Sequence, residues 1–137
     1  MEDCIFCQIA GGKADANIVF KNKDAVAFLD INPLADGHTV VIPKNHYRKF
    51  SDIPNNELEG IFTAVQKVTR AIRKGLGSKG CNIGINDGKV AGQAIPHTHI
   101  HIISRNEKDG GKSFHGLLNV ETSNDFEQIE KKIKKAI

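Results

Sequence analysis

The sequence predicts an α+β fold built on a mainly antiparallel sheet, and three patterns support this prediction. Two apolar runs at 18–20 and 25–29 flank a polar tetrapeptide, which is typical of a β-hairpin. A long stretch after Pro54 carries apolar residues at helical spacing and ends at Gly75-Leu76-Gly77. Short runs with strand character follow at 81–85 and 97–105. Several strands, one long helix and a tight hairpin together favour the α+β class.

The remaining elements follow from local signals. A third strand is expected at 38–43, after a loop marked by Asn32-Pro33 and Asp36-Gly37, and Pro43 ends it. Pro54 suits the first turn of the long helix, where a missing N–H costs nothing. The expected apolar stripe of that helix consists of Leu58, Ile61, Phe62, Val65, Val68 and Ile72. A final helix is expected from Asn124, with Asn124 as its cap, Glu127 three residues later, and one apolar face made of Phe126, Ile129, Ile133 and Ile137.

Length and composition indicate an ordinary globular protein. A chain of 137 residues without repeats or linkers fits one domain over 1–137. Glu2 and Asp3 stand where a signal peptide needs basic residues. No run approaches the ~20 apolar residues of a membrane span, so we expect no membrane partner. We therefore expect a cytoplasmic protein whose three cysteines are reduced.

The net charge of +3 is a weak signal. Four of the basic residues, Lys131, Lys132, Lys134 and Lys135, cluster near the end of the expected last helix, where cations suit the helix dipole. A nucleic-acid patch is the less favoured interpretation, because the chain lacks the interleaved aromatic and basic residues of a single-strand binder. We expect no nucleic-acid partner.

The segment His97-Thr98-His99-Ile100-His101 concentrates the chemistry. Side chains alternate along a strand, so the three histidines are expected on one face, with Ile100 and Ile102 on the other, toward the core. Three interpretations compete: an accidental polar face, a metal site of imidazole ligands, and a nucleophilic site. Clustered imidazoles resist joint protonation, which keeps at least one of them neutral and nucleophilic near pH 7.

The flanking residues favour the nucleophilic site. Gly92 and Gln93 precede the histidines in a loop whose backbone N–H groups could approach an oxyanion. His38, at the start of another expected strand, adds a fourth histidine.

With these residues in view, the sequence resembles the histidine triad family. Residues 97–103 match its motif of three histidines separated by apolar or small residues, with Thr98 as the polar spacer. Residues 28–33 and 37–46 resemble its N-terminal signature, the likeness extends over about residues 4–105, and the last helix resembles that of bacterial-type members. The resemblance implies a five-stranded sheet, a homodimer with a continuous sheet, and hydrolysis or transfer at the α-phosphate of a purine nucleotide.

The resemblance also implies roles for individual residues. His99 would carry a covalent nucleotidyl group, while His101, His38 and Gln93 would assist it. Asp30 would bind the ribose hydroxyls, although a simple turn cap is an equal alternative from the residues alone. The base pocket would comprise Phe6, Ile9, Phe28, Leu29 and Ile31, and the phosphate grip Asn86, Gly92, Gln93 and Ala94. Family members often have Ser or Thr, whose hydroxyl can donate to the leaving group, where this chain has Ala94, so the resemblance leaves the protonation of the leaving group and the preferred substrate open.

The pair Cys4 and Cys7 forms a C-x-x-C motif, which indicates half a zinc site or a redox pair. Some bacterial-type members of the family resemble this pattern and bind zinc, which implies His46 and His97 as the other two ligands. Cys81 is expected to be a buried strand residue.

Several functions remain open at this point. The first is a hydrolase of nucleoside phosphoramidates, with dinucleoside polyphosphates as alternative substrates. The second is a nucleotide-binding regulatory or scaffold protein with incidental turnover. A nucleotidyltransferase is disfavoured, because that branch usually has Gln at the position of His101. Neither the physiological substrate nor a preference for adenine or guanine follows from the sequence.

Overall fold

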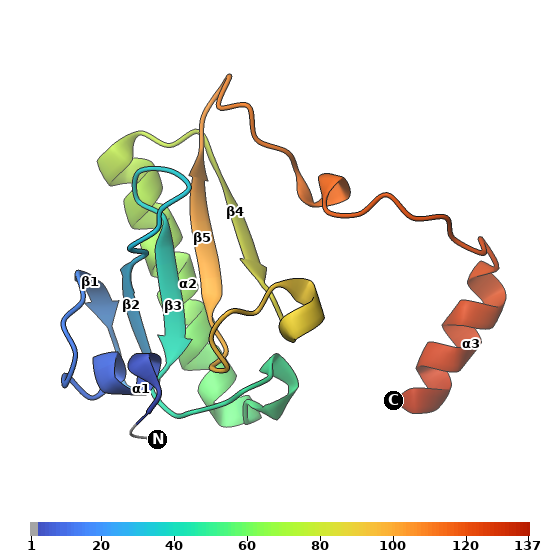
Figure 1. The fold of residues 1–137 in the computed structure, drawn as a ribbon, viewed down its shortest axis with the longest axis horizontal. Helices are drawn as coiled ribbons and strands as arrows, with labels where there is room; N and C mark the ends of the chain where they lie inside the picture. Colours follow the sequence, from blue (N-terminus) through green and yellow to red (C-terminus); the bar gives the residue numbers. More distant parts are fainter. Residues whose placement is uncertain (1–2) are drawn as a thin grey trace.

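A five-stranded antiparallel sheet forms the centre of the molecule. The computed structural model describes residues 3–137, so Met1 and Glu2, part of the segment weighed against a signal peptide, lie outside it. The strands are β1 (Ile18–Lys21), β2 (Ala25–Leu29), β3 (Thr39–Pro43), β4 (Gly80–Ile85) and β5 (Ile100–Arg105), in the spatial order β1-β2-β3-β5-β4. The predicted α+β class and antiparallel sheet are confirmed (Figure 1).

Helices cover both faces of the sheet. The long helix α2 (Asn55–Leu76) buries Ile61, Val65 and Val68 against one face, and the short α1 (Ile5–Ala10) buries Phe6 and Ile9 against the other. Alternation along the strands supplies both interfaces: Ala25 and Ala27 face α2, whereas Val26 and Phe28 face α1. The predicted inward orientation of Ile100 and Ile102 is confirmed, since both are buried in the α2 layer.

Three local expectations need correction. Helix α1 was not expected from its six residues, because an isolated helix of that length is marginal and depends on packing. Phe62 is exposed rather than part of the buried stripe, and its ring meets that of Phe50 at 6.2 Å. The final helix is capped by Asp125, whose side chain accepts a hydrogen bond from the backbone N–H of Gln128, and not by Asn124.

The C-terminal segment separates from this body after β5. It leads through irregular chain to α3 (Phe126–Ala136), which stands clear of the sheet on the side of β4 (Figure 1). Within the described residues, no helix is long and apolar enough to cross a membrane.

Candidate active site and metal-ligand cluster

The residues from His97 to His101 place three imidazoles on the α1 side of the sheet. Strand β5 begins only at Ile100, so His97 and His99 precede the regular strand rather than lying within it as expected. His101 pairs with Val40 in the sheet and therefore shares the face covered by α1. Phe6 of α1 meets His97 and His99 edge-on, with ring centroids 5.9 and 5.2 Å apart.

Backbone carbonyl groups fix the tautomers of two of these histidines. A carbonyl oxygen can only accept a hydrogen bond, so the ring nitrogen beside it must carry the proton. His99 Nδ1 donates to the His97 carbonyl oxygen at 2.7 Å, which leaves the lone pair of His99 on Nε2. His97 Nε2 donates to the Pro43 carbonyl oxygen at 2.9 Å, which leaves its lone pair on Nδ1.

A chain of hydrogen bonds orients His38 and His101 in the same way. The backbone N–H of Leu34 donates to His38 Nδ1 at 3.1 Å, so the proton of His38 is on Nε2. That proton is donated to His101 Nδ1 at 2.9 Å. His101 therefore carries its own proton on Nε2, the atom left to donate to a bound group. The ring centroids of His101 and His99 are 5.0 Å apart.

Burial keeps these imidazoles neutral. Desolvation, followed by the neighbouring His99 and His38, lowers the pKa of His101 to about 4, although Asp30 acts in the opposite direction. Burial also lowers the pKa of His38, again opposed by Asp30. Burial likewise lowers the pKa of His97 to about 4. At neutral pH these three rings are therefore uncharged. Each of the tautomers described above needs an uncharged ring, because a protonated imidazole has no nitrogen lone pair.

A cavity of about 470 Å³ opens beside His99 and His101. Its lining includes all of the residues proposed from the sequence to contact a nucleotide except Gln93: Phe6, Ile9, Phe28, Leu29, Asp30, Ile31, Asn86, Gly92, Ala94, His99 and His101. The cavity is also lined by residues that the sequence did not predict there: Ile5, Asp15, Ala16, Asn32, Val40 and Ile95. Four of them are apolar residues of ordinary core type, and neither Asp15 nor Asn32 belongs to the histidine motif, so only the fold brings these residues to the cavity.

Gln93 is not among the residues that line this cavity. Its Oε1 accepts from the backbone N–H of Gly88 and its Nε2 donates to the Arg48 carbonyl oxygen, both at 2.8 Å. The side chain thus ties together the two ends of the loop around the short helix Lys89–Ala91. Gly88 and Gly92 adopt φ values of +95° and +93°, which side chains rarely tolerate.

Asp30 caps a turn, which is one of the two roles considered for it from the sequence. Its Oδ1 accepts from the Asn32 backbone N–H at 2.8 Å, which is the turn-capping interaction. Its Oδ2 lies 3.5 Å from His38 Nε2 and 4.0 Å from His101 Nδ1, and the carboxylate lines the cavity. Capping therefore leaves one oxygen directed toward the histidines.

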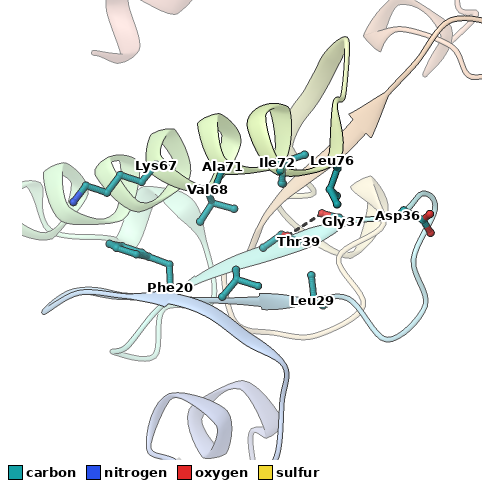
Figure 2. A pocket seen from close by; sticks show the side chains of 12 residues that line it. Phe20, Leu29, Asp36, Gly37, Thr39, Lys67, Val68, Ala71, Ile72 and Leu76 are labelled. Carbon is teal, nitrogen blue, oxygen red and sulfur yellow. Dashed lines mark hydrogen bonds between the residues drawn. The ribbon is translucent and has the colours of Figure 1, made fainter.

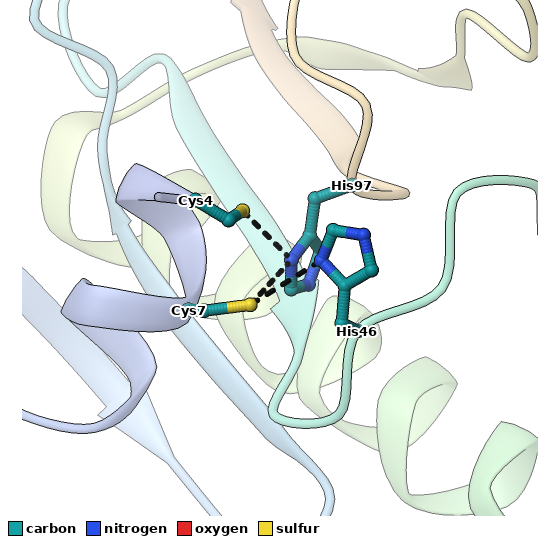
Figure 3. A group of neighbouring side chains, drawn as sticks. All are labelled: Cys4, Cys7, His46 and His97. Carbon is teal, nitrogen blue, oxygen red and sulfur yellow. Dashed lines mark hydrogen bonds between the residues drawn. The ribbon is translucent and has the colours of Figure 1, made fainter. Parts of the chain in front are cut away.

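Cys4, Cys7, His46 and His97 meet at the end of α1 (Figure 3). Their ligand atoms all lie within 4.8 Å of one another. His97 Nδ1 is 3.5 Å from both sulfur atoms, and His46 Nδ1 is 3.3 Å from Cys7 Sγ. Burial and the adjacent Cys4 raise the pKa of the Cys7 thiol, and burial lowers that of His46.

The geometry of this cluster fits a tetrahedral ion. Zn–S and Zn–N bonds of about 2.3 and 2.0–2.1 Å imply S···N edges of about 3.5 Å. The three S···N separations of 3.3–3.5 Å given above agree with that value. The lone pair of His97 is on Nδ1, the nitrogen that faces the sulfur atoms. This donor set can therefore hold a metal ion without rearrangement of His97.

Comparison with known proteins agrees with the fold and the histidine motif. A family model of the HIT domain matches residues 11–108. An uncharacterized HIT-like protein of Methanocaldococcus jannaschii is 43% identical over 132 residues, which are 96% of this chain and 98% of that protein. The chain belongs to the HIT, or histidine triad, family.

Relatives with named activities match a smaller part of their own length. The adenylylsulfatase HINT3 of Arabidopsis thaliana is 39% identical over 78% of this chain and 54% of that protein. An asymmetrical bis(5'-nucleosyl)-tetraphosphatase of Schizosaccharomyces pombe is 38% identical over 69% of this chain and 52% of that protein. The family thus includes nucleotide hydrolases.

Solved structures match almost the whole chain. A HIT family protein of Bacillus subtilis superposes with a TM-score of 0.88 at 34% identity, covering 98% of this chain and 97% of that one. A Zn-bound histidine triad family protein of Mycobacterium smegmatis superposes with a TM-score of 0.75 at 33% identity, covering 99% of each chain.

The tautomers can be checked directly. In ¹⁵N–¹H spectra of the imidazole groups at neutral pH, His99 should carry its proton on Nδ1, and His38 and His101 should carry theirs on Nε2, because of the acceptors named above. Spectra of single His→Ala variants would assign the signals, and the exposed His115 provides a reference. A His99 proton found on Nε2 would contradict this arrangement.

Proposed function

We propose that this chain hydrolyses purine nucleotides at the α-phosphate, as in nucleoside phosphoramidates, through a nucleotidyl group on His99. The observation that carries the proposal is the hydrogen bond from His99 Nδ1 to the His97 carbonyl oxygen beside the 470 Å³ cavity. It leaves His99 Nε2 with a lone pair, which a nucleophile needs. As a P–N bond forms at Nε2, the ring becomes cationic, and the carbonyl oxygen then accepts a stronger, charge-assisted hydrogen bond.

The neighbouring groups support each step of the exchange. When the Nε2–P bond forms, the bond from phosphorus to the leaving group breaks, and water later cleaves the Nε2–P bond to release the nucleoside monophosphate. His101 donates from Nε2 toward the phosphate region, held in place by His38. Gln93 is proposed as a positioning residue that braces the loop of Gly92, whose backbone would face the phosphate.

The identity of the leaving group depends on Ala94. This residue lines the cavity but offers no hydroxyl. A leaving group must then receive its proton from His101 or depart as an anion. The relatives include an adenylylsulfatase and a bis(5'-nucleosyl)-tetraphosphatase. Sulfate and nucleotides are therefore candidate leaving groups in addition to amines. A screen of phosphoramidates, adenylyl sulfate and dinucleoside tetraphosphates would rank them.

Zinc is proposed as a structural ion held by Cys4, Cys7, His46 and His97. Support comes from the tetrahedral separations and from the Zn-bound neighbour of M. smegmatis. Four protein ligands leave no open position, so the ion would stabilise the fold without activating water. It would fix α1, which carries Phe6, against the histidines.

A homodimer is proposed as the working assembly. β4 forms one edge of the described sheet, paired only with β5. Ile83 of this strand is an exposed apolar side chain. Such an edge invites pairing with another chain.

Replacement of the nucleophile gives the first test. His99→Ala should retain nucleotide binding and lose at least ~10³-fold in turnover, which corresponds to about 4 kcal/mol at the transition state. His115→Ala, on the exposed C-terminal segment, is the matched control and should keep its turnover. Near-normal turnover of His99→Ala would refute the assignment of His99 as the nucleophile.

The ribose contact gives the second test. Asp30→Ala should weaken binding of ribonucleotides by roughly 1.5–3 kcal/mol, because two charge-assisted hydrogen bonds are lost, and should affect 2′,3′-dideoxy analogues much less. Asp30→Asn keeps an acceptor for the Asn32 N–H and so separates ribose binding from turn capping. Equal weakening of both nucleotide types would show that Asp30 acts only through the turn.

Metal content gives the third test. Protein prepared without a histidine tag should contain one zinc per chain by elemental analysis, and Cys4→Ser/Cys7→Ser should contain almost none. The variant should melt ~5 °C or more below the wild type, since each kcal/mol of lost stability shifts melting by about that amount. Cys81→Ser is the control, because Cys81 lies on β4 outside the cluster. Wild-type protein with far less than one zinc would refute the site.

A further inference from the structure

The acceptor that fixes the tautomer of His99 belongs to a peptide group that is held at both ends. The carbonyl oxygen of His97 and the N–H of Thr98 are parts of one rigid, planar trans peptide. His99 Nδ1 donates to that carbonyl oxygen at 2.7 Å, and the N–H of Thr98 donates to the Tyr47 carbonyl oxygen at 2.6 Å. Because the plane is rigid, the Tyr47 carbonyl group sets the direction in which the His97 carbonyl oxygen points.

The bond from Thr98 to Tyr47 replaces a contact that a regular sheet would supply. Strand β5 begins only at Ile100, so the His97–Thr98 peptide lies outside the ladder. The hydroxyl of Thr98 is buried and has no hydrogen-bond partner among the described residues. It therefore adds no second hold on the peptide, and the orientation depends on the carbonyl group of Tyr47.

Tyr47 is in turn held from helix α2. Its hydroxyl donates to Glu57 Oε1 at 2.8 Å, and Asn45 Nδ2 donates to the same oxygen at 2.9 Å. Glu57 lies in the first turn of α2, and its Oε2 is buried without a hydrogen-bond partner in the described part of the chain. The hydrogen bond to Glu57 raises the pKa of Tyr47 above its ordinary value, so the hydroxyl stays a donor at neutral pH.

We propose that Glu57 is a positioning residue for the nucleophile and acts through Tyr47 and the His97–Thr98 peptide. Glu57 is absent from the lining of the cavity. Its carboxylate fastens the Tyr47 side chain to the long helix, the Tyr47 carbonyl group orients the peptide, and the peptide keeps the proton of His99 on Nδ1. The inference rests on the proposed role of His99 and names what holds its ring in the reactive form.

A purely structural role for Glu57 predicts something different. In that case the carboxylate only fastens the first turn of α2 to the preceding segment, and its loss lowers the free energy of unfolding. The folded molecules that remain would then have an unchanged His99. The two roles therefore differ in the state of the His99 ring at a temperature far below melting.

Imidazole ¹⁵N–¹H spectra and steady-state kinetics of Glu57→Ala test the positioning role. The proton of His99 should be divided between Nδ1 and Nε2, because the acceptor is no longer held in one direction. Exchange protection of the Thr98 amide should fall about tenfold or more. With a nucleoside phosphoramidate, kcat should fall about tenfold or more and KM should change little, because the residues that line the cavity are unaltered.

Three further variants separate the links of this chain of contacts. Tyr47→Phe keeps the ring against the core and removes only the hydroxyl, so it should reproduce most of the effect, and it carries the test if Glu57→Ala does not fold. Glu57→Gln keeps an oxygen that accepts from Tyr47 and should restore the single tautomer of His99 and most of the turnover. The double variant Glu57→Ala/Tyr47→Phe should be no slower than Glu57→Ala alone, because both changes break the same path.

Two other side chains of α2 provide matched controls. Glu59→Ala removes the same charge at an exposed position of the same helix. Lys67→Ala removes a contact between α2 and β1, where the Lys67 ammonium lies 5.3 Å from the centre of the Phe20 ring, beside an apolar groove of about 530 Å³ (Figure 2). Both variants should keep the turnover and the His99 tautomer of the wild type.

The possible outcomes are distinct. If Glu57→Ala keeps the His99 proton on Nδ1 and turns over like Glu59→Ala, the positioning role is overturned. A zinc content of Glu57→Ala far below that of the wild type would place the effect at His46, between Asn45 and Tyr47, and would overturn the proposed path as well. A divided His99 tautomer with full turnover would instead show that Glu57 positions the ring and that His99 is not the nucleophile, so the proposed function would fail separately.

Discussion

The hydrogen bond between His99 Nδ1 and the His97 carbonyl oxygen is the interaction on which the site depends. It is a contact between residues two apart, and it exists because the chain at 97–99 has not yet entered the regular ladder of β5. In a regular strand that carbonyl group would bond to a neighbouring strand. The irregular entry to β5 thus provides the acceptor that sets which nitrogen of His99 is free.

The three alternating histidines then serve three different purposes. His97 turns its lone pair toward two cysteines, His99 toward the cavity, and His101 receives a proton from His38. Their roles differ although their residue type does not, since each ring has a different partner on its second nitrogen. Burial supports this division, because protonated rings could not accept the hydrogen bonds that fix His38 and His101.

Helix α1 links the metal-ligand cluster to the cavity beside His99. Cys7 and Phe6 are adjacent, so one residue faces the ligand cluster while the next packs against His99 and Phe28. A six-residue helix has little stability of its own. An ion at its end would therefore hold this wall of the cavity in place. A structural metal would in this way affect ligand binding in the cavity without taking part in the reaction.

The sequence by itself determined the hairpin, the long helix, the strands and the histidine motif, because each depends on local periodicity or spacing. The residue types also supplied the proposals for His99 and for the cysteine pair. Only the tertiary structure decided which ring nitrogen is free, since that depends on the carbonyl groups of His97 and Pro43. It likewise turned Gln93 toward Arg48, exposed Phe62, and set the apolar face of α3 apart from the body, because these outcomes depend on contacts between segments distant in the chain.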